Sequence, residues 1–188
     1  MARPWQELDE ERLQDCRVFT VSRTRARSPR DGRVHDFFRI DASDWVHVVP
    51  ITPAGEVVMV RQWRHGAREV TLEIPGGMVD PGETPDAAAS RELLEETGYR
   101  AERVESLGFV NPNPALFGNR LHTFVARDVE RVAEVRNEGA EETVVELVPL
   151  VDVPRLLADG TIRHALVVAG LHLFELSRRR DEGGGTRG

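Results

Sequence analysis

The sequence predicts an α+β or α/β sandwich, and three observations support this fold class. Short segments with alternating or continuous apolar residues recur along most of the chain, as expected of strands. Two longer segments, residues 85–97 and 161–179, have the punctuation or apolar spacing of helices. The composition is 40% hydrophobic and 30% charged, which is ordinary for a soluble globular protein. One domain with an extension is therefore expected.

The N-terminal segment predicts an antiparallel β-hairpin. Its first dozen residues are polar, and residues 16–26 and 32–40 then read as two strands. Between them, "RSPRDG" has the proline and Asp-Gly chemistry of a turn. Such a hairpin has few large apolar residues and would be marginal alone, so a partner surface is expected. We assign residues 1–42 to this extension.

The remaining strands and the C-terminal helix form the predicted main domain, residues 43–180. Its expected strands are residues 45–52, 56–63, 69–77, 104–110, 119–129 and 143–150. The first two form a second hairpin around "PAG" and are the most hydrophobic of all. The helix of residues 161–179 ends on basic side chains, which suit a helix C-terminus. The glycine-rich tail, residues 181–188, is expected to be disordered.

The helix of residues 85–97 carries an unfavourable arrangement of charge. Thr84 is a good N-cap, Pro85 suits the first helical position, and Gly98 stands where a left-handed residue ends a helix. Three carboxylates near its C-terminus repel one another and face the negative end of the helix dipole. They are Glu92, Glu95 and Glu96. A bound cation would relieve this repulsion, whereas a solvated acidic face is the alternative interpretation.

Charge and cysteine content exclude several classes of protein. The formal net charge is −7, from 25 basic and 32 acidic residues, which argues against binding of nucleic acid along its phosphate backbone. Cys16 is the single cysteine, so neither an intramolecular disulfide nor a thiolate metal cluster is expected. No apolar run approaches the length of a signal peptide or membrane span. We expect a cytoplasmic protein without membrane partners.

Residues 77–99 follow the pattern G-x5-E-x7-R-E-U-x-E-E-x-G-U, where U is apolar. The specified positions are Gly77, Glu83, Arg91, Glu92, Leu93, Glu95, Glu96, Gly98 and Tyr99. Tyr99 departs slightly from the pattern, because most proteins with this signature carry an aliphatic or bulky apolar residue at that position. The segment resembles the Nudix box, the signature of the Nudix hydrolase family. The resemblance implies the Nudix fold, an α/β/α sandwich with a mixed central sheet, and metal-dependent hydrolysis of a diphosphate.

The same resemblance implies a metal site. Glu92 and Glu96 match the principal ligands of a divalent cation, and Glu95 matches an additional ligand or water-mediated contact. Gly76 matches the position whose carbonyl joins the metal shell. Mg²⁺ is the expected cofactor, with Mn²⁺ as the alternative, because oxygen ligands suit these cations and they neutralise a pyrophosphate.

Arg91 and Glu83 resemble the supporting pair of the family. In that pair the arginine orients a catalytic carboxylate, so Arg91 is placed among the catalytic residues. A plain surface ion pair is an equally open interpretation for Glu83.

The sequence on either side of the box resembles the ADP-ribose pyrophosphatase branch, which hydrolyses nucleoside diphosphate sugars. "VRQWRHG" and "EIPGG" match segments in which Arg64 and Glu73 would bind substrate, and Pro114 stands where that branch carries a proline. Members of this branch use an N-terminal segment to build a homodimer, which we also expect here. "NPNPALFGNR" departs from the branch and offers Arg120 as a different donor, so another nucleoside diphosphate sugar is as reasonable as ADP-ribose.

The general base is expected outside the box. Glu141 and Glu142 lie before the strand of residues 143–150, in a loop from which the branch takes its base. A carboxylate is suited to accept a proton from the attacking water, with Glu95 as the candidate inside the box. The alternative for this loop is a solvated acidic segment without chemical role. The six histidines show no metal-ligand spacing and are interpreted as structural or surface residues.

Two further functions stay open. The first is hydrolysis of another nucleoside diphosphate derivative. The second is a non-catalytic regulator that senses a nucleotide sugar on the same scaffold, because a fold does not determine a function. Such regulators usually lack the box glutamates and carry an added DNA-binding segment. The intact box and the absence of a basic helix-turn-helix segment in the sequence favour the enzyme.

Overall fold

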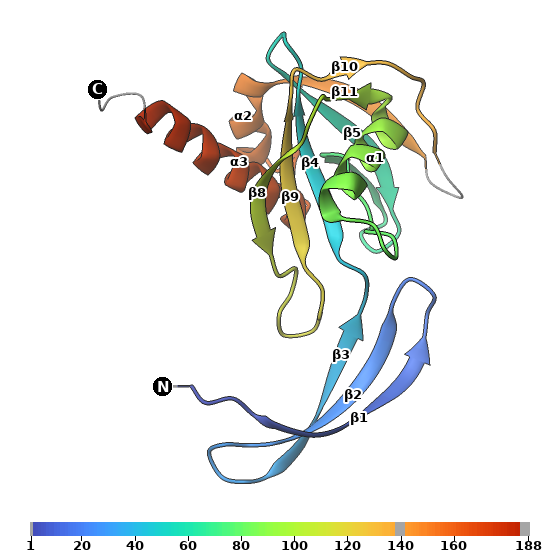
Figure 1. Cartoon of the computed structure of the whole chain (residues 1–188), viewed down its shortest axis with the longest axis vertical. Coiled ribbons are helices and arrows are strands. Elements are labelled where there is room, and N and C mark those ends of the chain that lie inside the picture. The colour runs from blue at the N-terminus through green and yellow to red at the C-terminus, as the bar shows by residue number, and fades with distance from the viewer. Residues whose placement is uncertain (1, 138–141, 185–188) are drawn as a thin grey trace. The chain divides into compact units, whose positions relative to one another are not determined.

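The computed structural model describes residues 2–137 and 142–184 and divides the chain into two compact units. One comprises Met1–Ser43 and Asn111–Arg120, and the other Asp44–Val110 and Leu121–Gly188 (Figure 1). The sequence places the boundary at residue 42, close to that division, but assigns residues 111–120 to the main domain. Among the described residues, no helix has both the length and the apolar character that a membrane span requires.

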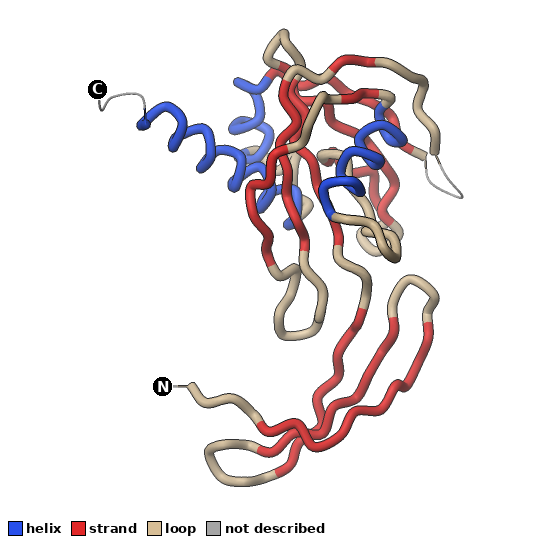
Figure 2. The backbone as a smooth tube through the Cα atoms, in the orientation of Figure 1, coloured by secondary structure: helices blue, strands red, loops and turns tan. Residues whose placement is uncertain are grey.

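The first unit contains a three-stranded antiparallel sheet instead of the expected hairpin (Figure 2). Its strands are β1 (Gln6–Asp15), β2 (Thr20–Arg27) and β3 (Val34–Asp41), paired in that order. Strand β1 was not expected, because every residue of it is exposed and its polar sequence gives no apolar alternation. Residues 16–19, expected in a strand, form the turn into β2, with Arg17 in the left-handed region (φ 67°).

The segment Asn111–Arg120 completes the first unit by pairing with the end of β3. Ile40 donates its backbone N–H to Leu116 O at 2.8 Å, and Gly118 N–H returns to Ile40 O at 3.1 Å. The side-chain amide of Asn119 donates to Ser43 O at 2.9 Å and is itself buried. A loop distant in sequence therefore belongs structurally with the N-terminal strands.

The second unit is built on a mixed six-stranded sheet, as the sequence predicts. Strands run in the order β11-β5-β4-β9-β8, and β6 pairs with β5. Among these described strands, β4 pairs with β9 in parallel, and the other pairings are antiparallel. Their bounds are β4 (Trp45–Ile51), β5 (Glu56–Arg64), β6 (Glu69–Glu73), β8 (Glu105–Val110), β9 (Leu121–Arg127) and β11 (Thr143–Pro149). Two short strands, β7 (Tyr99–Arg100) and β10 (Glu130–Arg131), pair separately.

Helices cover both faces of this sheet, which gives the expected α/β/α layers (Figure 1). The helices are α1 (Pro85–Thr97), the 3₁₀ turn η1 (Leu150–Asp152), α2 (Val153–Ala158) and α3 (Ala165–Gly184). Successive residues of β4 point to opposite faces. Val46 and Val48 pack with Leu93 of α1, whereas Val49 packs with Leu171 of α3. Strand alternation thus supplies two separate hydrophobic cores.

Helix α1 begins and ends where the sequence predicts. Pro85 occupies the first turn, and Gly98 adopts φ 74° and donates its N–H to Leu94 O, which closes the helix. The prediction for Thr84 was wrong in one respect, because its side chain makes no capping hydrogen bond. Ala88 and Ala89 face the sheet, and these small side chains let the helix lie close to it.

Helix α3 extends further than expected. It continues to Gly184, so residues 181–184 are helical rather than part of a disordered tail, while residues 185–188 lie outside the described residues. Asp181 forms an ion pair with Arg127 of β9 at 3.6 Å, and Arg127 also lies over the ring of Phe174. These contacts connect the C-terminal part of the helix to the sheet.

Candidate active site

A cavity of about 750 Å³ lies in the second unit, where β4 and β9 begin and β5 ends. Residues from these strands, from the loop before α1, from α1 itself and from the start of α3 surround it. The lining residues are Trp45, Val46, His47, Gln62, Arg64, Gly76, Gly77, Met78, Asp80, Arg91, Glu92, Glu95, Glu96, Leu121, Arg136, Asn137, His164 and Leu166. All three predicted metal-binding glutamates, and Gly76, therefore contribute to one cavity.

The two glycines before α1 permit a close approach between the loop and the carboxylates. A Cβ atom on Gly77 would overlap the carboxylate of Glu92, and one on Gly76 would overlap Val46 O. The N–H of Gly76 donates to Glu96 Oε2 at 2.9 Å, and Glu96 is buried. The glycine loop thus holds Glu96 by its amide. The predicted role of the Gly76 carbonyl as a metal ligand stays a prediction.

The guanidinium of Arg91 donates hydrogen bonds to three carboxylates. It donates two hydrogen bonds of 3.0 Å to Glu83, one of 2.8 Å to Glu92 and one of 3.0 Å to Glu95. A further bond of 3.0 Å reaches Met78 O. The bonds to Glu83 are the largest of the effects that raise the pKa of Arg91, and the bond from Arg91 is the largest of those that lower the pKa of Glu83.

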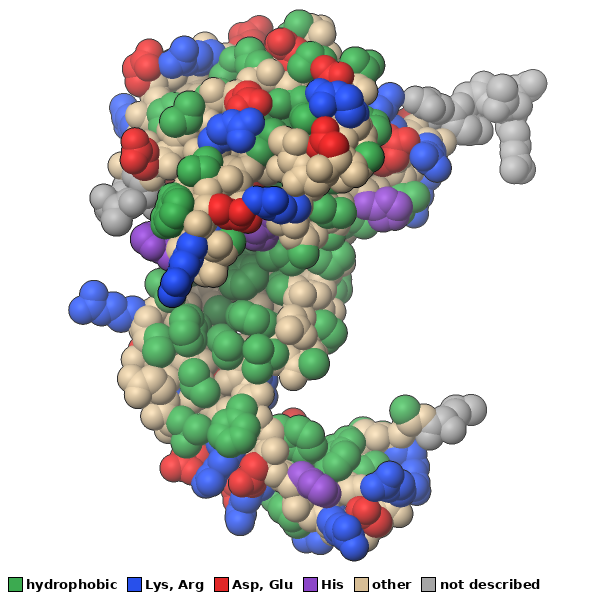
Figure 3. Space-filling model, turned by 180° about the vertical axis from the view of Figure 1, so that it is seen from behind, with side chains coloured by type: hydrophobic (Ala, Val, Ile, Leu, Met, Phe, Trp, Pro, Cys, Tyr) green, Lys and Arg blue, Asp and Glu red, His purple; other side chains and the backbone are tan. Residues whose placement is uncertain are grey.

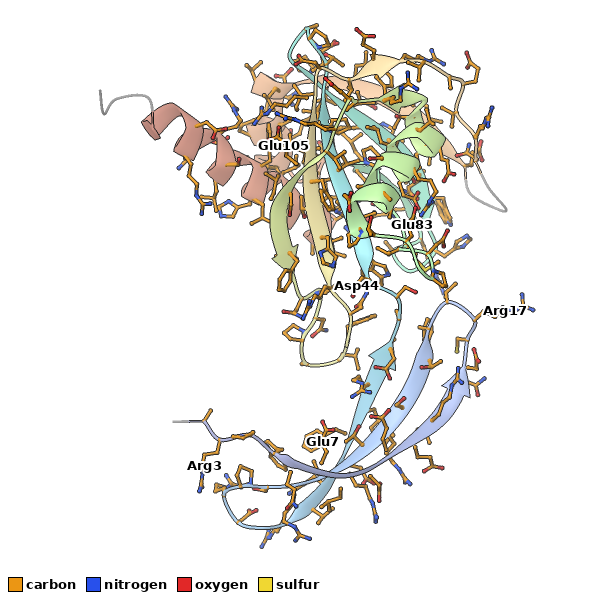
Figure 4. All side chains as sticks on the ribbon, viewed as in Figure 1. Arg3, Glu7, Arg17, Asp44, Glu83 and Glu105 are labelled. Carbon is orange, nitrogen blue, oxygen red and sulfur yellow. The ribbon has the colours of Figure 1, made fainter. Side chains whose placement is uncertain are left out.

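Figure 4 shows Glu83 in the loop beside α1. The expected Arg91–Glu83 pair is therefore present, and it also restrains Glu92 and Glu95.

The residues present fit a divalent cation. Glu83, Glu92, Glu95 and Glu96 bring four carboxylates to one region that Arg91 neutralises only in part. All their donors are oxygen atoms, which Mg²⁺ and Mn²⁺ prefer. Within residues 2–137 and 142–184, however, no three acidic, histidine or cysteine side chains converge as a preformed metal site. The guanidinium of Arg91 lies between Glu92 and Glu95 instead.

Arg64, which lines the cavity, forms an ion pair with Glu73. Arg64 donates two hydrogen bonds to Glu73, of 2.8 and 2.7 Å, and Thr71 donates a third of 2.5 Å. Burial alone would raise the pKa of Glu73, but these bonds outweigh it and keep the pKa below its ordinary value. Glu73 is fully buried and does not line the cavity, whereas Arg64 does. Any effect of Glu73 on substrate is therefore indirect, through Arg64 or through its charge near His47 and His164.

One of the two predicted base candidates, Glu142, lies next to β11 and is not among the residues that line the cavity. Glu142 is exposed and immediately precedes Thr143, the first residue of that strand, while Glu141 lies outside the described residues. Thr143 contacts the backbone of Glu96. Pro114 and Arg120, two further predicted substrate contacts, belong to the first unit, where Pro114 lines a smaller cavity of about 270 Å³. Their roles stay predictions.

Several cavity residues were missed from the sequence, above all His47 and His164. Their ring centroids lie 6.4 Å apart, and Nδ1 of each is buried without a partner among the described residues. Burial lowers the pKa of His47 to about 4, so its ring is neutral at pH 7. The sequence contained one signal for His47. Side chains alternate between the two faces of a strand, so His47 should point away from the face of Val46 and Val48. No signal pointed to Arg136 or Asn137, which reach the cavity from a loop.

Comparison with known proteins decides the family. Residues 44–171, more than half of the chain, match the model of the NUDIX domain. The chain belongs to the Nudix family. This match spans the box, the sheet and the start of α3, and leaves the strands of the first unit outside it.

Relatives of this Nudix protein include enzymes named for nucleotide sugars. An ADP-ribose pyrophosphatase of Bacillus subtilis is 31% identical over 133 residues, 70% of this chain and 71% of that protein. An ADP-sugar pyrophosphatase of Mus musculus is 33% identical over 146 residues, 72% and 67% of the two chains. A solved structure of an ADP compounds hydrolase has a TM-score of 0.83 at 25% identity and covers 100% of this chain and 99% of its own. This similarity confirms the expected Nudix fold.

Proposed function

We propose that this protein hydrolyses the pyrophosphate bond of ADP-ribose or a related nucleoside diphosphate sugar, giving a nucleoside monophosphate and a sugar phosphate. One observation carries the proposal: the carboxylates of α1 and the glycine loop surround a cavity large enough for such a substrate. The names of the relatives support the substrate class. They include ADP-ribose, ADP-sugar and GDP-mannose pyrophosphatases, so the nucleobase and the sugar differ among them.

Glu92, Glu96 and the carbonyl of Gly76 would hold Mg²⁺ or Mn²⁺, with Glu95 as a further ligand. When bound there, the cation neutralises the diphosphate and makes water more acidic. Arg91 restrains Glu92 and Glu95 through its hydrogen bonds and so preserves their orientation toward the cavity. Arg64 also lines the cavity, held by Glu73, and its guanidinium can bind an anionic oxygen of the substrate.

Glu142 is the proposed general base, and Glu141 is its competitor. A carboxylate that already binds metal is poorly suited to accept the proton of the attacking water, which favours a residue outside α1. Glu142→Gln is expected to lower kcat at least about 100-fold while the Mg²⁺ concentration for half-maximal rate stays nearly unchanged. Glu141→Gln is the control in the same assay. Full rates in both variants across pH would move the base to Glu95.

A substrate panel tests the activity itself. ADP-ribose, GDP-mannose, other nucleoside diphosphate sugars, dinucleotides and nucleoside triphosphates would be supplied with Mg²⁺ or Mn²⁺, and the phosphate products identified. Nucleoside monophosphate plus sugar phosphate is the expected outcome for the nucleotide sugars. Pro114 and Arg120 are proposed to influence which sugar is preferred. If no nucleotide sugar is hydrolysed but one binds tightly, the sensing regulator would replace the enzyme.

The proposal includes a cytoplasmic homodimer built through the first unit. This unit exposes large apolar side chains that a partner would cover: Trp5, Leu8, Leu13, Val18, Val34, Phe37, Phe38 and Leu116. Figure 3 shows hydrophobic side chains exposed on one face of the molecule. Light scattering at micromolar concentration is expected to give twice the mass of the chain. A stable monomer would contradict the dimer while leaving the catalytic proposal intact.

A further inference from the structure

Two backbone carbonyls in the last turn of α1 accept hydrogen bonds from the residues that flank the acidic loop before β11. These flanking residues are Arg136 on one side and Thr143 on the other. Carbonyls in this part of a helix have no intrahelical partner. Arg136 N–H donates to Glu95 O at 2.7 Å, and the hydroxyl of Thr143 donates to Glu96 O at 3.1 Å. Both flanks of the loop are thus attached to the helical turn whose side chains line the cavity.

Asn137 and Thr143 also bond to each other and close the base of the loop. The side-chain oxygen Oδ1 of Asn137 accepts hydrogen bonds from the Thr143 hydroxyl at 2.7 Å and from the Thr143 backbone N–H at 3.2 Å. Because the hydroxyl has a single proton, it is shared between Asn137 Oδ1 and Glu96 O. Thr143 is buried, so its bond to Glu96 O is shielded from water, whereas its bonds to the exposed Asn137 are partly shielded. We call this arrangement the Asn137–Thr143 clamp.

Glu142 lies directly before this clamp in the chain. Its side chain is exposed and forms no ion pair with any residue in the described part of the chain. Its Cα is one peptide unit, about 3.8 Å, from that of Thr143. The clamp therefore connects the residue next to Glu142 to the backbone of Glu96, a proposed metal ligand, in addition to the pairing of Thr143 with Gln62 of β5.

We propose that Asn137 and Thr143 are positioning residues that hold Glu142 where it accepts the proton of the attacking water. The inference rests on the proposed function and extends it to two residues that do not touch the reacting atoms. Alignment of a base with its substrate is sensitive to small displacements, and a shift of about 1 Å can reduce a rate about 100-fold. Loss of the clamp should therefore affect turnover much more than binding.

Hydroxyl removal at Thr143 is the direct test. Thr143→Val keeps the shape of the side chain and is expected to lower kcat about 10- to 100-fold, with KM and the Mg²⁺ requirement within about twofold of wild type. Asn137→Ala should behave alike, and Thr143→Ser should recover most of the rate. Thr123→Val is the matched control, because Thr123 is fully buried and its hydroxyl has no partner among the described residues. Circular dichroism and thermal unfolding check that each variant folds.

A double variant separates positioning from general damage. If the clamp acts through Glu142, Thr143→Val combined with Glu142→Gln should be no slower than Glu142→Gln alone. If the losses of kcat caused by the two single substitutions multiply in the double variant, this inference is overturned and the proposed function stands. A Thr143→Val enzyme with wild-type kcat would have the same consequence. A wild-type protein that hydrolyses no nucleoside diphosphate sugar would overturn the proposed function and this inference together.

Discussion

The two units of the molecule use strands of opposite character. In the second unit, Val46, Val48 and Val58 are fully buried, and apolar packing on both faces of the sheet holds the strands. In the first unit, every residue of β1 is exposed, and its carboxylates meet arginines across the sheet. These cross-strand ion pairs are Asp9–Arg25, Glu11–Arg23 and Glu10–Arg39. Burial stabilises one sheet, whereas backbone pairing and charge complementarity specify the other.

In the first unit, the interactions that determine the alignment of the strands differ from those that stabilise the sheet. Exposed ion pairs contribute little free energy, and salt screens them further. Opposite charges facing each other nevertheless favour one alignment of neighbouring strands over its one-residue slip. We infer that the charges of the first unit determine how β1 aligns with β2, while its stability comes from another source, such as the proposed dimer contact.

The largest expected effect concerns catalysis in the second unit. Glu96→Gln or Glu92→Gln keeps the size of the side chain but removes the charge that would hold the cation. We expect kcat to fall at least about 1,000-fold, since metal binding and water positioning each contribute several kcal/mol. The fold should stay intact, because like-charge repulsion at the end of α1 is relieved. Near-normal turnover at saturating Mg²⁺ would contradict the metal assignment.

Truncation of the core is expected to be the next largest effect. Leu93 is almost completely buried between α1 and the sheet, so Leu93→Ala should lower the unfolding free energy by about 2–5 kcal/mol. Val151, which is 86% exposed, supplies the control, and Val151→Ala should change it by less than about 0.5 kcal/mol. Urea titration measures both. Equal effects would argue against burial as the source of stability.

Acid should weaken the second unit through His47. Its pKa is about 6.5 in the unfolded chain and about 4 in the folded one, because burial opposes the charged ring. The charge of Glu73 opposes this lowering of the pKa, whereas His164 and Arg64 add to it. The unfolded chain therefore binds a proton that the folded chain does not, between about pH 6.5 and 4. This contribution to stability is complete above pH 6.5 and is lost as pH falls toward 4, about 3 kcal/mol in all.

Denaturant titrations of the metal-free protein at several pH values measure this loss, with His47→Gln as the comparison. The variant should show a flatter dependence on pH, and an unchanged slope would exclude His47 as the cause. Asp9 of the first unit differs, because its hydrogen bond from Arg25 lowers its pKa and keeps it charged over this range.

The smallest effect is expected for a single ion pair of the first unit. Arg25→Gln removes the partner of Asp9 and should leave kcat and the urea midpoint of the second unit unchanged. Amide hydrogen exchange in β1 should increase, since charge no longer favours its alignment with β2. Arg30→Gln is the control, because Arg30 is highly exposed and pairs only with the adjacent Asp31 among the described residues. No difference in exchange between the variants would refute a role of charge in alignment.

The sequence predicted the second unit well because burial leaves a pattern. Apolar alternation located its strands, and Pro85 and Gly98 located both ends of α1. Strand β1 was missed, because a strand exposed on both faces has no apolar pattern to recognise. The candidate site was predicted as far as local motifs extend, which includes Arg91 and the glutamates of α1.

Contacts between distant segments were beyond sequence reasoning. The burial of Glu73 behind Arg64 depends on how β5 and β6 pair. The Asn137–Thr143 clamp depends on two loop residues meeting the end of α1, which no spacing in the sequence encodes. Motifs therefore identified chemical groups, whereas the arrangement that supports these groups required the fold.

The parallel pairing of β4 with β9 has a consequence for how the protein is made. Strands β1, β2 and β3 follow one another directly, so they can meet while the rest of the chain is still being synthesised. The pairings of β4 with β9 and of β5 with β11 must wait, because β9 and β11 come much later in the chain. Pairing over such sequence distances is slow, because the entropy of loop closure precedes any gain from contact. On the ribosome, we expect the N-terminal strands to exist for some time before a catalytic cavity does.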